Sequence, residues 1–335
     1  MDQRFLYEIL YALAARDGRE QALFGKCAPA AREAFARSVP AGTMPEIWFE
    51  APLLGEPRFD LHVLTSREAL NPESPFPPEE TGGFPEAFRW FAGQEQTVRQ
   101  LALSWDLYPD QVPSPAVQLL VSRAKPDTVP GFLSAAGRED AAERYRIFTG
   151  RIPENWFACY FGVFPGRPGS NLRVECIPKH PLQAAYAEDP ELLRKHLEQA
   201  GFSAFGETML SRCQTLARTP FQLEFQFDIG EDGRPGPVLG ASLRFACPPG
   251  ESGWYSFDTE EADRLMEQIS GWGLADDRWK HLKKTIFATR VARGEEKSRI
   301  FCFTAFIKLR WRGGEPLDAK AYLMAGMEKA GEEPA

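Results

Sequence analysis

The sequence has few of the groups that build disulfide frameworks or metal sites. Its six cysteines are scattered along 335 residues, and no two of them form a C-x-x-C pair. The four histidines, at positions 62, 180, 196 and 281, show no metal-ligand spacing. These absences argue against a disulfide scaffold and a zinc site, so we predict reduced, buried cysteines, no dedicated metal site and a cytoplasmic location.

Signals for membranes and nucleic acids are also lacking. No apolar stretch approaches the roughly 20 residues of a membrane span, and the N-terminal segment has acidic residues and no signal-peptide cleavage pattern. Lys and Arg number 39 against 47 Asp and Glu, which gives a net charge of −8. An acidic chain is a poor partner for nucleic acid, although it can still contain a local basic pocket. We therefore predict neither a membrane nor a nucleic-acid partner.

Short catalytic motifs are absent as well. The sequence contains no G-x-x-x-x-G-K-[ST], no G-x-G-x-x-G after a strand, no H-E-x-x-H and no G-x-S-x-G. It also lacks a D-D-x-x-D cluster that could hold a diphosphate through magnesium. Any chemistry must therefore come from residues that the fold brings together.

The clearest pattern that is present is a hairpin over residues 300–325, where two strand-like runs flank Gly313 and Gly314. In the second run, Lys320 and Tyr322 share one face because strand side chains alternate. In the first run, strict alternation puts Phe301, Phe303, Ala305, Ile307, Leu309 and Trp311 on one face, opposite Cys302, Thr304, Phe306, Lys308 and Arg310. The hairpin thus offers cations and a phenol to one space.

Similar strand pairs recur along the chain, and helical segments precede each of them. Strand pairs are predicted at 46–51 with 58–64, 155–164 with 171–177, 221–228 with 238–245, and 300–325. Helical spacing is found at 3–16, 28–38, 85–93, 95–105, 139–149, 190–200, 204–217, 259–271 and 276–292. A further strand at 117–122 has no evident partner, for which 124–137 is a candidate, and the Pro-rich segment 71–84 predicts an exposed loop.

In each clear pair one face is apolar and the other carries ionisable groups. The apolar face must be covered by the helices, whereas the polar face either meets solvent in an open sheet or lines the lumen of a closed barrel. Closure also removes exposed strand edges. We therefore predict an α+β fold with a single domain over residues 1–335, an antiparallel ten-stranded β-barrel of ααββ repeats with an outer ring of helices. Residues 1–40 are expected to form N-terminal helices, and 326–335 a disordered tail.

The polar faces would bring ionisable side chains together inside such a barrel. They comprise Glu50, Arg58, Asp60, His62, Arg173, Glu175, Glu224, Arg244, Lys308, Arg310, Lys320 and Tyr322. Buried cations repel one another, so they indicate either internal ion pairs with the carboxylates or a bound polyanion such as a diphosphate. Both interpretations stay open at this point, and His62 is expected to be a structural histidine.

With these features the chain resembles the aromatic prenyltransferases of the ααββ (ABBA) barrel, most closely the peptide prenyltransferases of cyanobactin biosynthesis. The similarity covers residues 40 to 325. It is found in the strand ending at Glu50, in FACYFGVFPGRPGSNLRVECIP, in EFQFDIGEDGRPGPVLGASLRF and in the closing KLRWR…AKAYL. The final K-x-Y resembles the diphosphate clamp of the family. The sequence departs from the family pattern in two places. Its second hairpin is indistinct, and Arg173 stands where the family has lysine, so that a planar guanidinium replaces the compact charge of an ammonium group.

The resemblance implies transfer of a dimethylallyl or geranyl group from its diphosphate to an electron-rich side chain of a peptide. Glu50 would accept the proton of the acceptor. Cations would stabilise the leaving diphosphate, and we expect this role for Arg58, Arg173, Arg244, Lys308, Arg310, Lys320 and Tyr322. Aromatic walls would shield the carbocation, with Trp48, Trp156, Tyr160 and Phe306 as candidates, while Gly240 could leave room for a longer donor.

Further expectations concern cofactors and partners. Mg²⁺ would accompany the diphosphate without dedicated protein ligands, and the protein is expected to act as a monomer. Two alternatives are a small-molecule aromatic prenyltransferase and a non-catalytic barrel that binds a lipid-like or anionic ligand. A base such as Glu50 opposite the cations favours an enzyme, because a carrier has no need of one.

Overall fold

The computed structural model describes residues 3–39, 45–67, 70, 84–95, 97–109, 113–122, 125–166, 172–245, 257–283, 286–293 and 296–329. Its strands form one antiparallel sheet in the order β11-β1-β2-β3-β4-β5-β6-β7-β8-β10-β9, and β11 also pairs with β10. The strands are β1 (Glu46–Pro52), β2 (Asp60–Ser66), β3 (Val98–Trp105), β4 (Ala116–Val121), β5 (Trp156–Val163), β6 (Leu172–Pro178), β7 (Gln222–Ile229), β8 (Pro235–Arg244), β9 (Ile286–Arg293), β10 (Glu296–Arg312) and β11 (Glu315–Lys329).

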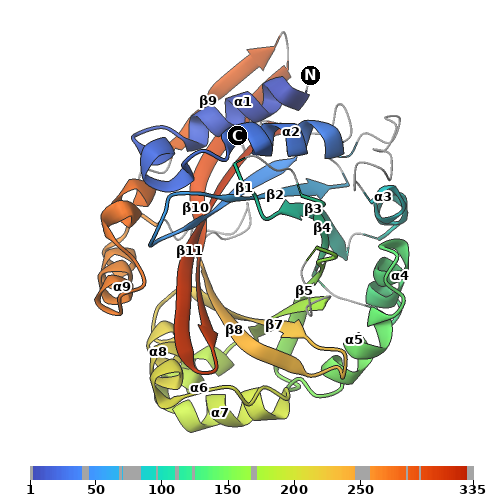
Figure 1. The fold of residues 1–335 in the computed structure, drawn as a ribbon, viewed down its shortest axis with the longest axis vertical. Coiled ribbons are helices and arrows are strands. Elements are labelled where there is room, and N and C mark those ends of the chain that lie inside the picture. The colour runs from blue at the N-terminus through green and yellow to red at the C-terminus, as the bar shows by residue number, and fades with distance from the viewer. Residues whose placement is uncertain are drawn as a thin grey trace, which may run out of the picture.

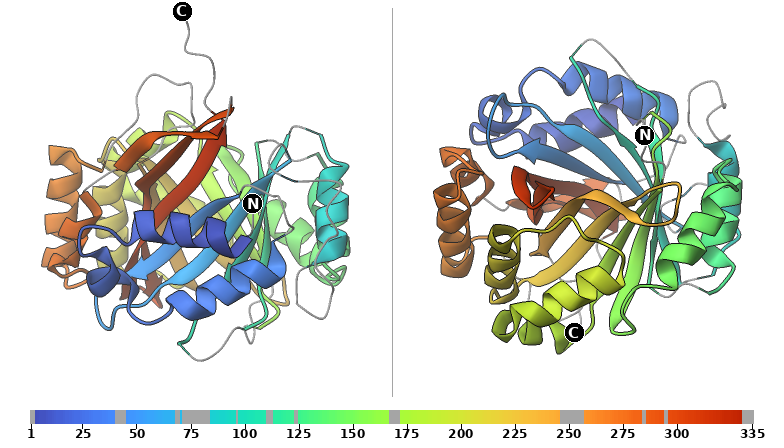
Figure 2. Two further views of the ribbon diagram at one scale, coloured as in Figure 1. Left: turned by 90° about the horizontal axis from the view of Figure 1, so that it is seen from above. Right: turned by 60° about the horizontal axis from the view of Figure 1, so that its bottom comes forward.

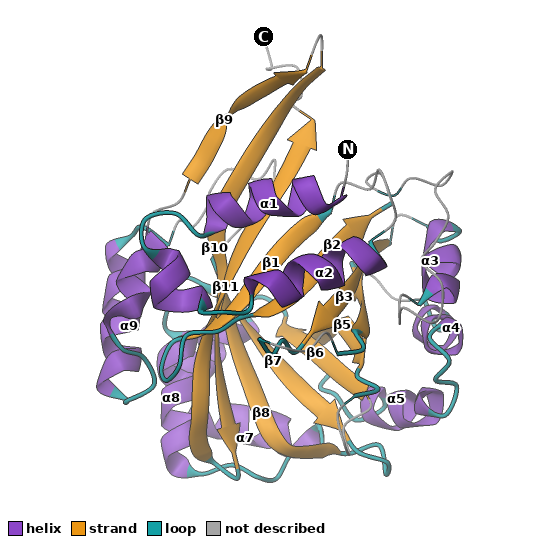
Figure 3. Ribbon diagram, turned by 45° about the horizontal axis from the view of Figure 1, so that its top comes forward, coloured by secondary structure: helices purple, strands orange, loops and turns teal. Residues whose placement is uncertain are grey.

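The sheet closes on itself. Strand β11 pairs with β1 on one side and with β10 on the other, and β10 continues the ring through β8. Ten strands, β1–β8 with β10 and β11, therefore form a closed barrel, which confirms the predicted fold class (Figure 1). Strand β9 pairs only with the first part of β10, and this part of the sheet rises beyond the ring (Figure 3).

Helices surround the barrel on its outside, as three views agree (Figures 1 and 2). Helix α1 packs against β11, α3 against β3, α5 against β7 and α8 against β11. The helices are α1 (Gln3–Ala14), η1 (Glu20–Phe24), α2 (Ala28–Ser38), α3 (Pro85–Ala92), α4 (Thr128–Ala135), α5 (Ala141–Thr149), α6 (Leu182–Glu188), α7 (Pro190–Gln199), α8 (Glu207–Ala217), α9 (Glu260–Gly271) and η3 (Asp277–Lys283).

Two separate apolar clusters result from the alternation of side chains. The larger lies between the strands and the helices and includes Ile47 and Phe49 of β1. The smaller lies inside the barrel, where Phe301, Phe303, Ala305, Phe306 and Tyr322 pack with Trp48 and Met324. Apolar contacts thus hold the barrel wall to its helices, while the inside carries a mixture of rings and ionisable groups. The described cysteines, Cys27, Cys159, Cys176, Cys213 and Cys302, are buried and free, as the sequence predicts.

The second hairpin is formed by β3 and β4, and this corrects the prediction for two segments. Residues 98–105, predicted as part of a helix, form a strand that pairs with β2 and β4. The candidate partner at 124–137 instead contains α4. A short apolar run such as LALSW is compatible with a buried strand or a buried helix, and pairing with neighbouring strands decides between them.

The predictions for the last helix and for the C-terminal tail are also wrong in part. Residues 276–292 contain a short 3₁₀ helix, η3, followed by the strand β9. Strand β11 continues to Lys329, so residues 326–329 belong to the barrel hairpin and not to a tail. Residues 330–335, like 71–83 of the predicted exposed loop, lie outside the described residues.

A β-bulge at Ala305 changes which side chains of β10 point inward. The pairing with β11 shifts between Thr304 and Phe306. Before the bulge, Phe301 and Phe303 point into the barrel, whereas after it Phe306 takes that side. Because a bulge inserts one extra residue, it reverses the alternation that follows. The predicted faces of 301–311 are therefore correct only after the bulge, where Ile307, Leu309 and Trp311 belong to the outer cluster.

The turn of the closing hairpin supplies a test of this architecture. Gly313 and Gly314 both have positive φ, at 60° and 86°. A Cβ on Gly314 would lie 2.6 Å from the backbone nitrogen of Gly206, which precedes α8, whereas a Cβ on Gly313 would meet nothing within 4 Å. We expect Gly313→Ala to cost about 1–2 kcal/mol of backbone strain. Gly314→Ala should cost about 1–3 kcal/mol more through overpacking, as measured by urea unfolding. Equal losses in the two variants would contradict the contact between this turn and α8.

Candidate active site

The lumen contains a small cavity lined by aromatic, aliphatic and ionisable side chains. Its volume is about 50 Å³. Nine of the ten barrel strands contribute to its lining, which consists of Trp48, His62, Leu64, Gln118, Leu120, Cys159, Tyr160, Arg173, Glu175, Glu224, Gln226, Ser242, Arg244, Phe306, Lys308 and Tyr322. Such a volume suits a few water molecules, whereas sites for drug-sized ligands measure roughly 300–1,000 Å³. A substrate of prenyl diphosphate size must therefore displace side chains that now fill the lumen.

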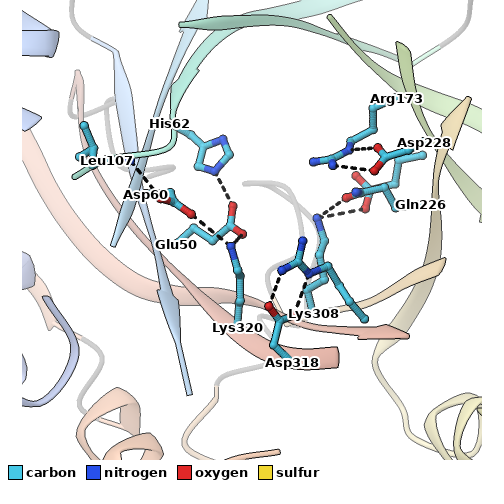
Figure 4. A network of polar contacts seen from close by, with 12 residues as sticks. Glu50, Asp60, His62, Leu107, Arg173, Gln226, Asp228, Lys308, Asp318 and Lys320 are labelled. Atoms are coloured by element: carbon cyan, nitrogen blue, oxygen red, sulfur yellow. Dashed lines mark hydrogen bonds and ion pairs between the residues drawn. The ribbon is translucent and has the colours of Figure 1, made fainter. Parts of the chain in front are cut away.

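One side of the lumen carries Arg173 and its carboxylate partner (Figure 4). Arg173 on β6 donates two hydrogen bonds to Asp228 on β7, with an Nε–Oδ1 distance of 2.7 Å and an Nη2–Oδ2 distance of 3.2 Å. Its guanidinium also lies 4.4 Å from the ring centre of Phe164. Burial acts to lower the pKa of Arg173, but Asp228 outweighs it, so the pKa lies above its ordinary value.

Next to this pair lies a group of two cations and two carboxylates. Arg244 on β8 has its Nε 3.0 Å from Oε1 of Glu224 on β7. Lys308 donates to Gln226 and has its Nζ 3.9 Å from Oε1 of Glu175. Burial, opposed by Arg244, raises the pKa of Glu224 to about 7. Burial also lowers the pKa of Lys308, against the attraction of Glu175.

The opposite side of the lumen holds the cluster of Glu50, Asp60, His62 and Lys320 (Figure 4). Lys320 Nζ lies 2.7 Å from Oε1 of Glu50 and 3.1 Å from Oδ2 of Asp60. Nε2 of His62 lies 2.7 Å from the other oxygen of Glu50. Burial by itself raises the pKa of Glu50, but Lys320 and the hydrogen bond from His62 hold it well below the usual value. Glu50 is therefore ionised.

Aromatic rings also lie in the lumen. The ring centres of Trp48 and Phe306 are 5.2 Å apart, and Tyr322 lies 6.3 Å from Trp48 and 6.0 Å from Phe306. Two cations approach ring faces here, since Arg244 lies 5.1 Å from the Phe306 centre and Lys308 4.9 Å from that of Tyr322. These π faces could stabilise a positively charged ligand as well as the resident cations.

The charges of the lumen compensate one another. Arg173, Arg244, Lys308 and Lys320 each have a carboxylate within 4 Å, and Arg310 forms a two-pronged ion pair with Asp318. Internal ion pairs, one of the two interpretations of the sequence, are thus present in this structure. An incoming anion would have to compete with these carboxylates for the cations.

The predicted site residues divide into three groups by position. Seven of them line the cavity: Trp48, Tyr160, Arg173, Arg244, Phe306, Lys308 and Tyr322. Glu50 and Lys320 lie beside it in the ion-pair cluster, and Arg310 is held by Asp318. Arg58 is exposed ahead of β2, outside the cavity lining. Gly240 is not among the residues that line the cavity, and a Cβ there would lie 3.1 Å from the Cβ of Gln226.

Trp156 does not belong to the predicted pocket. It stacks on Phe225 and Phe227 in the outer cluster, and its indole nitrogen donates to Tyr186 of α6 at 2.6 Å. A bulge between Ala158 and Tyr160 is responsible, because it reverses the alternation of β5 and places Trp156 outside but Tyr160 inside.

Two residues of the site were not predicted although alternation could have identified them. Gln226 lines the cavity and Asp228 pairs with Arg173, and both follow Glu224 on the polar face of β7. Gln118 was missed because it lies in the second hairpin, whose partner strand was not recognised. Among the described residues no group of three or more His, Cys, Asp or Glu side chains is arranged to hold a metal ion. None of the described helices combines the length and the apolar character needed to cross a membrane.

Comparisons with known proteins agree with this architecture. No family model matches the sequence, and no curated protein is detectably similar to it. Among solved structures, 5-dimethylallyltryptophan synthase from Streptomyces coelicolor superposes with a TM-score of 0.50 at 12% identity, over 96% of this chain and 97% of the synthase. The apo form of the prenyltransferase PriB superposes with a TM-score of 0.52 at 14% identity, over 96% of both chains. The chain has the fold of a prenyltransferase barrel. At this identity the similarity establishes the fold alone.

The raised pKa of Glu224 predicts a pH-dependent stability. A carboxyl group with a pKa of about 7 in the folded state, against about 4.3 when unfolded, binds protons more tightly in the folded state. Its contribution to stability is therefore complete below about pH 4.3 and is lost as the pH rises to about 7. We expect the unfolding free energy of the wild type, relative to Glu224→Gln, to fall over this interval. Urea unfolding between pH 4 and 8 measures it, and the exposed Glu231→Gln is the control. A constant difference would contradict the raised pKa.

Proposed function

We propose that the protein is a prenyltransferase that moves a dimethylallyl or geranyl group from its diphosphate to an electron-rich side chain of a peptide. The observation that carries the proposal is the set of cations from four strands around one aromatic-walled cavity in a closed barrel. Arg173, Arg244, Lys308 and Lys320 come from β6, β8, β10 and β11 respectively. Each of these cations has a resident carboxylate partner, and a diphosphate would be the anion that competes with it.

The donor would enter by exchanging counter-ions. Its diphosphate oxygens can replace the carboxylates of Asp228 and Glu224 on Arg173 and Arg244, because a guanidinium binds phosphate with the same two-pronged geometry. Ionisation of the allylic C–O bond then increases the negative charge on the diphosphate, which fixed cations stabilise. Rings such as Trp48 and Phe306 would face the resulting carbocation and exclude water from it.

The acceptor is the less constrained part of the proposal. We assign a peptide on the sequence resemblance to the cyanobactin enzymes. A small aromatic acceptor is the second candidate, and the specific observation in its favour is the full-length structural similarity to a dimethylallyltryptophan synthase. A carrier without chemistry is the remaining alternative, and it would bind a diphosphate without modifying any acceptor.

Mg²⁺ is proposed only as a companion of the donor. The carboxylates nearest the cavity are engaged by cations, so the described part of the lumen offers the metal no ready set of oxygen ligands. We expect EDTA to slow transfer without abolishing it, as measured by product formation at saturating donor. Complete loss with EDTA would show that the metal has an essential role.

The decisive experiment combines the protein with dimethylallyl or geranyl diphosphate and two sets of acceptors. One set is a panel of linear and cyclic peptides bearing Trp, Tyr, His or Arg, and the other is free tryptophan and small phenols. Mass spectrometry should detect the addition of one prenyl unit to a peptide. Modification of the small acceptors only would select the second candidate, and diphosphate binding without turnover of any acceptor would select the carrier.

Counter-ion exchange predicts opposite effects for the two members of an ion pair. Asp228→Asn should bind the donor about tenfold more tightly, because Arg173 no longer has a competing carboxylate, a gain of about 1.4 kcal/mol. Arg173→Gln should weaken binding by roughly tenfold or more through loss of a charge-assisted bond. Calorimetry with a non-hydrolysable donor analogue measures both, with the exposed Asp232→Asn as control. Weaker binding by Asp228→Asn would contradict the exchange.

A further inference from the structure

Glu50, the residue that the sequence selects as the base, is poorly placed and poorly suited for that role. It is absent from the cavity lining. Both of its carboxylate oxygens are engaged, one by Lys320 at 2.7 Å and the other by His62 at 2.7 Å. Burial opposes the effect of these partners on its pKa, yet the partners hold that pKa well below the ordinary value. A carboxylate held in its ionised form by two donors is a weak proton acceptor.

His62 has the position that Glu50 lacks. It lines the cavity, and its ring centre lies 5.7 Å from that of Tyr322. On the neighbouring strand β1 its cross-strand partner is Trp48, which lines the same cavity. Its side chain is 13% exposed, so it is shielded but open to the lumen. Strand β2 thus presents an imidazole beside the aromatic wall where an acceptor would lie.

The hydrogen bond to Glu50 determines which ring nitrogen of His62 carries the proton. An ionised carboxylate can only accept hydrogen bonds, so Nε2 must be the donor in the 2.7 Å contact with Glu50. In the neutral ring Nδ1 is then the nitrogen with a lone pair. Figure 4 shows the second ring nitrogen directed away from Glu50. The pair has the arrangement of a base whose orientation is set by a carboxylate behind it.

We propose that His62 accepts the proton of the acceptor during prenyl transfer, and that Glu50 is a positioning residue behind it. This inference rests on the proposed function. The allylic C–O bond of the donor breaks and its electron pair leaves with the diphosphate. An electron pair of the acceptor forms the new bond to the prenyl carbon, and the proton that the acceptor loses goes to Nδ1 of His62. The resulting imidazolium is stabilised by the carboxylate of Glu50 at Nε2–H.

Several ionisable groups surround His62. Glu50 approaches from β1, Lys320 and Tyr322 from β11, and Asp60 lies on its own strand two residues away. From β3 its cross-strand neighbour is the neutral Ser104. An imidazole that already carries a proton on both ring nitrogens has no lone pair left to accept another. Transfer should therefore decline on the acid side.

The test compares His62→Gln with Glu50→Gln. In His62→Gln the amide can still donate to Glu50, so the fold is kept while the basic nitrogen is lost. We expect kcat for transfer to fall by about 10²- to 10⁴-fold and the acid-side decline to vanish. Release of diphosphate from the donor in the absence of an acceptor should fall much less than transfer does, because ionisation needs no base. In Glu50→Gln transfer should be slower, but the acid-side decline should persist. The exposed His180→Gln is the matched control.

Two results would overturn the inference. One is an acid-side decline that disappears in Glu50→Gln and persists in His62→Gln, which would make Glu50 the base. The other is an equal loss of diphosphate release and of transfer in His62→Gln, which would show a role in donor binding.

A measurement that does not need activity separates this inference from the proposed function. ¹⁵N NMR of histidine-labelled protein, with His62→Gln to assign the signal, reports the tautomer of His62 at neutral pH. A proton on Nε2 supports the inference even if no prenyl transfer is found with the donors and acceptors above. A proton on Nδ1 overturns it, whatever the activity of the wild type.

Discussion

The lumen depends on one constraint, which is that a charge inside a closed barrel must have a partner. Burying an unpaired charge costs several kcal/mol, and the closure of β11 against both β1 and β10 leaves the lumen side chains little access to water. The partners come from adjacent strands. Asp228 of β7 faces Arg173 of β6, and Glu50 of β1 faces Lys320 of β11. Ion pairing across neighbouring strands therefore allows this sequence to line a closed barrel with cations.

This compensation also shapes how the site can work. Cations held by fixed carboxylates are already oriented, which is what stabilisation of a leaving diphosphate requires. These cations are already bound to carboxylates, however. A donor therefore gains affinity only to the extent that its oxygens bind the cations more strongly than the resident carboxylates do. The cavity of about 50 Å³ leads to the same conclusion from volume, since the donor must displace the side chains that now occupy its place. Binding and rearrangement of the ion pairs are thus one event.

Much of the barrel followed from alternation in the sequence, and the errors have identifiable physical causes. Alternation placed Trp48 and Arg173 in the lumen because their strands are regular around them. It failed for Trp156, because the bulge before Tyr160 depends on how β5 pairs with β6 and leaves no trace in the alternation of β5 itself. The strand at 98–105 was mistaken for a helix for a related reason. The apolar run alone is compatible with a helix or a strand, and pairing with β2 and β4, which lie elsewhere in the sequence, makes it a strand.

The roles of Glu50 and His62 could not be separated from the sequence, although both were assigned to the inward face. Both ionise, and their strands are neighbours, so alternation treats them alike. The distinction comes from Lys320, which reaches the pair from β11 at the far end of the chain and engages Glu50. That ion pair makes the carboxylate a weaker base, and it fixes the side of the imidazole that carries the proton. A partner supplied by closure of the barrel thus decides which of two adjacent groups is able to accept a proton.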